Sequence, residues 1–245
     1  MKENRTIMGM PVNIEIIDSN ATEEVFEEVF NYLISIDERF SIYKKTSEIT
    51  LFNEGKILEK DFSNDMKEIF RLSLQTKNDT DGFFDIIYSG KIDPSGLVKG
   101  WAIYKAAEIL RKKGIKNFYV EIAGDIEIAG FNSEGKKWAI GIRNPFNKKE
   151  NVKIVYLSDK GIATSGTYER GEHIYNPKEK KVANEVLSLT VIGPNVYEAD
   201  RFATACFAMG RKGIEFVERL SDFEGYMIDH EGITTFTSGF EKYLK

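Results

Sequence analysis

The segment YEADRFATACFAMG, residues 197–210, is expected to form a helix that carries two polar side chains on an otherwise apolar surface. Asp200 and Thr204 are four positions apart, a spacing that stacks two side chains on one face of a helix. The two hard oxygen donors, one from each side chain, could then bind the same ligand. In the alternative interpretation, Asp200 complements the helix dipole in the first turn and Thr204 bonds back to a carbonyl.

The segments around this helix are expected to form blocks of strands and blocks of helices. Apolar spacing predicts helices at 19–40, 64–78, 96–113 and 197–211, the last continuing after a glycine into 213–221. Ser19 or Asn20 is the expected cap of the first helix. Strands are predicted at 11–18, 117–130, 137–143, 152–157, 160–164 and 187–193, before a closing hairpin that turns at His230–Gly232. This order predicts an α+β fold, a largely antiparallel sheet with packed helices, in one domain 1–245.

The composition excludes several classes of function. The chain has 245 residues, of which 42% are hydrophobic and 30% charged, and its net charge is −5. Interspersed acidic and basic residues argue against nucleic acid or an anionic membrane surface as a partner. One cysteine, Cys206, and two histidines, His173 and His230, make a Cys/His zinc site very improbable. A bound metal would be held mostly by oxygen, as magnesium, calcium and manganese are.

The N-terminal residues show no continuous apolar signal region, and no later run approaches the roughly 20 apolar residues of a membrane span. A cytoplasmic protein is the default expectation. An exported or membrane-associated protein is expected if a leader was removed from the sequence.

Three further stretches contain residues suited to chemistry. In residues 161–181, Ser165 and His173 lack the Gly-x-Ser-x-Gly pattern of a hydrolase, so a polar hairpin and an anion-binding loop both stay open. Gly96 and Gly100 flank Lys99 at a helix start, a weak signal for an anion site. Residues 121–130 are expected to be a strand with a glycine interruption, typical of a bulge.

Ten fragments, taken in order, resemble the FAD:protein FMN transferase family, ApbE. They lie between Met8 and Phe240 and read MGMPV, FSIYKKTSEITLFN, DGFFD, GLVKGWAIYKA, EIAGDI, WAIGIRNP, IATSGTYER, HIYNP, LTVIGP and EADRFATACFAMG. The resemblance implies the family's architecture, which is related to the T-fold. It also implies a magnesium-dependent enzyme that transfers FMN from FAD to a threonine hydroxyl of a target flavoprotein and releases AMP.

The resemblance also implies roles for individual residues. The metal ligands would be Asp200, Thr204 and the backbone oxygens of Ala102 and Ala203. FAD contacts would be made by Met8, Tyr43, Asn53, Phe83, Phe84, Asp85, Lys99, Lys105, Thr164, Ser165, Gly166 and Ile174. His173 would be the base that accepts the proton of the incoming hydroxyl. The implied partners are FAD and an acceptor flavoprotein, and a homodimer is an open expectation.

The sequence departs from the family pattern at three places. Only residues 86–98 stand where members usually have a long insert that helps cover the flavin. Ala123-Gly124-Asp125 replaces the usual Gly-Gly-Asp, and Asn176 stands where Asp is common after the histidine. Two other functions therefore stay open: an FAD pyrophosphatase that yields FMN and AMP, and a protein that binds FAD without chemistry.

Overall fold

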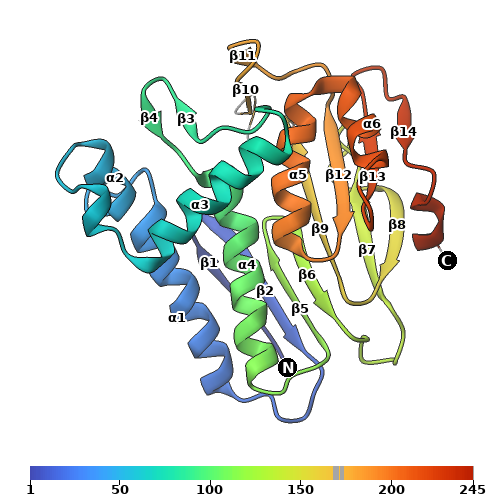
Figure 1. Ribbon diagram of the computed structural model, residues 1–245. Helices are drawn as coiled ribbons and strands as arrows, with labels where there is room; N and C mark the ends of the chain where they lie inside the picture. Colours follow the sequence, from blue (N-terminus) through green and yellow to red (C-terminus); the bar gives the residue numbers. More distant parts are fainter. Residues whose placement is uncertain (168–170, 172–173, 245) are drawn as a thin grey trace.

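The computed structural model describes residues 1–167, 171 and 174–244, and an eight-stranded antiparallel sheet runs through it (Figure 1). Each neighbouring pair of strands is antiparallel. In sheet order the strands are β1 (Lys2–Ile7), β2 (Met10–Ile16), β5 (Phe118–Ile122), β6 (Asp125–Ala129), β9 (Lys160–Gly166), β12 (Ser188–Gly193), β13 (Glu224–Ile228) and β14 (Thr234–Phe236).

Helices cover one face of this sheet, as Figure 1 shows. Those that lie on the sheet are α1 (Glu23–Phe40), α4 (Ser95–Lys112), α5 (Val196–Ala208) and α6 (Gly213–Glu218), while α2 (Glu48–Asn53) packs against α1 and α3 (Asn64–Asp79) packs against α4. Single 3₁₀ turns lie at η1 (Glu59–Asp61), η2 (Gly210–Lys212) and η3 (Phe240–Tyr243). One buried cluster joins α1 and α4 to β2 and β5, and a second joins α5 and α6 to β9, β12 and β13. Within the described residues, none of the helices has both the length and the apolar character needed to cross a bilayer.

The opposite face is covered by a separate hairpin, β7 (Trp138–Arg143) and β8 (Asn151–Leu157). Its apolar side chains form a third buried cluster with Ile126 and Ile128 of β6 and with residues of η3. Because side chains alternate along a strand, Asp125 and Glu127 of β6 point to the helix side instead. Two short hairpins, β3 (Ile87–Tyr88) with β4 (Lys91–Ile92) and β10 (Tyr175–Asn176) with β11 (Lys181–Val182), complete the described elements.

The predicted fold class is confirmed, and the structure corrects several details of the expected elements. The helices expected at 64–78, 96–113 and 197–211 are present with small shifts of their ends. The expected cap of the first helix is wrong: Thr22 is the N-cap, and acidic Glu23 and Glu24 occupy the first turn. The sequence does not predict strand β1 or helix α2, since neither segment shows a clear periodic pattern of apolar residues. That residues 1–245 form one domain stays a prediction.

The expectation of one strand over 117–130 is also wrong. The chain reverses at Ala123 and Gly124, both of which have positive φ values, 49° and 94°. Two consecutive residues of positive φ fit a tight hairpin turn, which explains the glycine but places an alanine in a costly conformation. Ile122 therefore pairs with Asp125, and this turn brings Asp125 to the end of the sheet.

Glycines and one buried carboxylate set the position of helix α5. A Cβ atom on Gly161 would lie 1.9 Å from the Val196 nitrogen, and one on Gly100 would lie 2.5 Å from Asp200 Cβ. The Val196 N–H donates to Glu127 Oε2 at 2.7 Å, and Glu127 Oε1 pairs with Arg111 Nη2 at 2.5 Å. The start of α5 is thus held against both β9 and α4.

We predict that Gly161→Ala destabilises the protein by about 3 kcal/mol, because the added methyl group overlaps the backbone of α5 and must displace it. Urea denaturation measures the loss. Lys160→Ala, on the adjacent residue of the same strand, should change the free energy of unfolding by no more than about 0.5 kcal/mol. Equal stability of the two variants would show that α5 does not need this close contact.

Candidate active site

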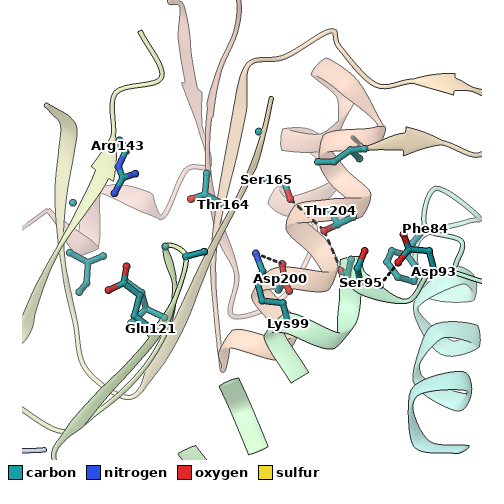
Figure 2. A pocket seen from close by; sticks show the side chains of 18 of the residues that line it. Phe84, Asp93, Ser95, Lys99, Glu121, Arg143, Thr164, Ser165, Asp200 and Thr204 are labelled. Carbon is teal, nitrogen blue, oxygen red and sulfur yellow. Dashed lines mark hydrogen bonds and ion pairs between the residues drawn. The ribbon is translucent and has the colours of Figure 1, made fainter. Parts of the chain in front are cut away.

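A cavity of about 720 Å³ lies at the end of the sheet where the β5–β6 turn and the end of β9 come together (Figure 2). The start of α4 and the first turns of α5 form one side of it, and β7 forms the other. Figure 2 shows Asp200, Thr204, Ser165 and Lys99 grouped on the helix side, with Glu121 and Arg143 across the cavity. The cavity therefore extends past the strand ends, from the face of the sheet covered by helices to the face covered by the β7–β8 hairpin.

The structure places most, but not all, of the predicted site residues at this cavity. Those that line it are Phe83, Phe84, Asp85, Lys99, Thr164, Ser165, Gly166, Ile174, Asp200 and Thr204. Six others lie outside its lining: Met8, Tyr43, Asn53, Lys105, Ala102 and Ala203. His173 lies outside the described residues. The functional roles of all these residues stay predictions.

Oxygen atoms from three elements meet around the Thr204 hydroxyl. Thr204 Oγ1 lies 3.4 Å from Ser165 Oγ at the end of β9, and it donates to the Gly96 carbonyl oxygen of α4 at 3.4 Å. Both distances are long for hydroxyl hydrogen bonds, so these oxygens are only weakly satisfied by one another. Asp200 lies one helical turn before Thr204 and lines the same cavity, as the spacing in the sequence predicted.

Three charged groups lie together beside this oxygen cluster. The Lys99 ammonium forms a close ion pair with Asp125 and lies 3.8 Å from Asp200 Oδ1. Asp125 Oδ1 accepts the Thr164 N–H at 3.1 Å, and Asp200 Oδ2 accepts the Gly100 N–H at 2.8 Å. Burial, with a smaller contribution from Asp125, raises the pKa of Asp200 to about 7, although Lys99 and the Gly100 N–H lower it.

The oxygen donors fit a magnesium ion better than a transition metal. Among the described residues, no group of three or more His, Cys, Asp or Glu side chains is arranged to hold a metal. Asp200 contributes one carboxylate to the same cavity wall as the hydroxyls of Thr204 and Ser165 and the carbonyl of Gly96. Magnesium commonly takes one or two carboxylates and completes its shell with water and substrate phosphates.

The carbonyl oxygen at this cluster belongs to Gly96, six residues before the predicted ligand Ala102. Gly96 lines the cavity, whereas Ala102 and Ala203 are fully buried within their helices. In the sequence, Gly96 carries only a weak signal, as part of a possible anion site. The glycine itself is the feature that marks this position, because it allows a close approach to α5: a Cβ on Gly96 would lie 3.3 Å from the Thr204 methyl carbon.

The predicted FAD contacts outside the cavity make other interactions in the structure. The Asn53 amide donates to the Ile92 carbonyl and accepts the Ile92 N–H, both at 2.8 Å, and so holds strand β4. Lys105 pairs with Glu68 at 3.0 Å. Tyr43 is 90% exposed. Met8 lies in the β1–β2 turn with φ = 56°.

Several cavity residues were not anticipated from the sequence. Tyr119 and Trp138 stack with ring centroids 5.7 Å apart, and the Tyr119 hydroxyl donates to Glu121 Oε2 at 2.5 Å. Segment 86–98 contributes Tyr88, whose ring centroid lies 4.7 Å from that of Tyr175. This contact joins hairpins β3–β4 and β10–β11 at the rim, so the short segment still borders the cavity.

The sequence profile of the ApbE family matches residues 8–90 and 88–227, which is most of the chain. The chain belongs to the ApbE family. It is 25% identical over 279 residues to the FAD:protein FMN transferase of Escherichia coli K12, covering 88% of this chain and 80% of that protein. The corresponding protein of Haemophilus influenzae is 23% identical over 308 residues, with coverage of 96% and 89%.

Solved structures show the same fold for this ApbE homologue. The flavin transferase ApbE from Vibrio cholerae superimposes with a TM-score of 0.85 at 24% identity, over 100% of this chain and 99% of that one. The apbe protein from Thermotoga maritima superimposes with a TM-score of 0.89 at 20% identity, with the same coverage. The predicted family resemblance is therefore confirmed.

We predict that Asn53→Ala lowers the free energy of unfolding by about 1–3 kcal/mol, because it leaves both backbone groups of Ile92 without their partner. Urea denaturation measures the change. Tyr43→Ala, which removes a fully solvated ring nearby in the sequence, should leave stability within about 0.5 kcal/mol of the parent. If Asn53→Ala is equally harmless, the amide does not hold β4.

Proposed function

We propose that this protein is a magnesium-dependent FAD:protein FMN transferase, which cleaves the pyrophosphate of FAD and joins FMN to a threonine hydroxyl of an acceptor flavoprotein. The observation that carries the proposal is the cluster of oxygens from Thr204, Ser165 and Gly96, with the carboxylate of Asp200 one helical turn from Thr204 on the same cavity wall. Membership in the ApbE family and similarity to proteins named FAD:protein FMN transferase support it.

The charges at the cavity explain why a divalent cation suits this reaction. The pyrophosphate of FAD is anionic, and among the described residues the carboxylates of Asp125 and Asp200 face the ammonium of Lys99 on this wall. When bound, magnesium would reverse the local charge, polarise the phosphoryl oxygens and stabilise the departing AMP. Asp200, Thr204 and Gly96 are the residues that would hold it.

The remaining residues would bind and orient the substrate. Phosphoryl transfer depends mainly on positioning and on charge stabilisation. Lys99 and the hydroxyls of Thr164 and Ser165 lie where they can donate to phosphate oxygens. The aromatic rings of Phe83 and Phe84 offer apolar surface of the kind that a flavin ring needs.

His173 is the proposed base for the acceptor hydroxyl. Its ordinary pKa of roughly 6.5 suits proton transfer near neutral pH. The neighbouring Ile174 lines the cavity, which supports this assignment.

Product analysis separates this function from its two alternatives. The purified protein is incubated with FAD and Mg²⁺, with and without an acceptor protein that carries a target threonine. Covalently flavinylated acceptor together with AMP indicates transfer, whereas free FMN and AMP in both reactions indicate a pyrophosphatase. Bound FAD that releases no AMP over hours would contradict both enzymatic functions and leave a flavin-binding protein.

Asp200→Ala should abolish magnesium-dependent release of AMP from FAD, because it removes the carboxylate that lies beside the oxygen cluster. Glu198→Gln is the matched control: this carboxylate lies on the same helix but pairs with Arg201 at 2.7 Å and does not line the cavity. Circular dichroism checks that both variants fold. Turnover by Asp200→Ala at the parent rate would refute the proposed metal site.

His173→Ala should slow transfer to the acceptor threonine by about 10²- to 10⁴-fold while FAD still binds, as expected for loss of a general base. His230→Ala serves as the control, since that ring is exposed, bonds the Asn184 carbonyl and does not line the cavity. Rates come from the appearance of flavin fluorescence on the acceptor in a gel. Equal rates for the two variants would remove His173 from the mechanism.

A further inference from the structure

Lys99 stands between two buried carboxylates, and its distances to them differ. The ammonium forms its close ion pair with Asp125, whereas Asp200 Oδ1 lies 3.8 Å away. The aliphatic stem of Lys99 comes from α4, Asp125 from β6 and Asp200 from α5. Three separate elements therefore decide which carboxylate the ammonium contacts.

Asp125 is held in place independently of Lys99. It is almost completely buried, and its Oδ1 accepts the Thr164 N–H of β9 at 3.1 Å. The tight turn at Ala123–Gly124 immediately precedes it and limits the freedom of its backbone. A carboxylate anchored in this way draws the lysine toward β6 and away from α5.

The contact with Asp125 keeps the Lys99 ammonium out of hydrogen-bond distance of Asp200. Asp200 Oδ2 accepts the Gly100 N–H at 2.8 Å, while Oδ1 faces Lys99 beyond hydrogen-bond distance. When both carboxylates are ionised, they and the one ammonium give the group a net charge of −1. Without the charge of Asp125, Lys99 and Asp200 would neutralise each other, and the ammonium would compete with a cation for Oδ1.

We propose that Asp125 is a positioning residue that holds the Lys99 ammonium off Asp200 and thereby sets the affinity of the site for its divalent cation. This inference rests on the proposed function, because it assumes that Asp200 binds the cation. In this proposal Asp125 is not one of the residues whose oxygens bind the cation. Asp125 acts through Lys99, not by contact with the metal.

Titration with Mn²⁺, followed by electron paramagnetic resonance of the free ion, tests the proposal on the whole protein without any turnover. Asp125→Asn keeps the shape of the side chain and an oxygen that can accept the Thr164 N–H. It should weaken Mn²⁺ binding at least tenfold, because the neutral amide releases Lys99 toward Asp200.

The double variant Asp125→Asn/Lys99→Met distinguishes positioning from a merely structural role. It restores the net charge of −1 and removes the competing ammonium, so Mn²⁺ affinity should return to within about threefold of the parent protein. If Asp125 served only to brace β9, removing Lys99 would not restore binding. No recovery in the double variant would therefore overturn the proposal.

Glu127→Gln is the matched control. Glu127 is buried on the same face of the same strand, but its partners are Arg111 and the Val196 N–H. It should lower the melting temperature and leave Mn²⁺ affinity within twofold. An equal loss of Mn²⁺ affinity in this variant would mean that removing any carboxylate from β6 weakens binding, and this result would also overturn the proposal.

The parent protein keeps the two levels of inference apart. If it shows no Mn²⁺ binding, the proposed metal site itself fails, and the role of Asp125 fails with it. If it binds Mn²⁺ and Asp125→Asn binds equally well, only the positioning role is refuted.

Discussion

The structure depends on the burial of a carboxylate at a crossing of two helices. Asp200 lies where α5 meets α4, and this approach is possible only because Gly100 has no side chain. An isolated buried carboxylate would be very costly, so its surroundings must compensate it. The Gly100 N–H does so through a hydrogen bond and the Lys99 ammonium through its charge at 3.8 Å, and both residues belong to α4. Packing and electrostatics are thus set by the same two adjacent residues.

Strand β6 connects this site to the rest of the fold. Its side chains alternate between Ile126 and Ile128, which pack under the β7–β8 hairpin, and Asp125 and Glu127, which face the helices. Asp125 engages α4 and β9, and Glu127 engages α4 and the first residue of α5. Two carboxylates on one strand therefore hold in register the elements that carry the proposed metal ligands.

The cavity combines this buried region with a border of short hairpins. Tyr88 and Tyr175 meet across the rim, and Lys178 pairs with Asp81 at 2.6 Å and lies 4.5 Å from the centroid of the Phe83 ring. These contacts join two segments that each contain only a few residues of regular structure. The side chains of these two hairpins thus form the border of the cavity at this point.

The sequence by itself determined the α+β class, the main helices, the family and the pairing of Asp200 with Thr204, because these follow from local periodicity or from ordered motifs. It did not reveal the reversal at Ala123–Gly124, since an alanine with positive φ gives little local signal. Only the tertiary structure decided that the Gly96 carbonyl joins Thr204 and that Asp125 joins Lys99. Those contacts link residues that are 108 and 26 positions apart in the sequence. Such residues come together only through the packing of the helices against the sheet, which local sequence patterns do not specify.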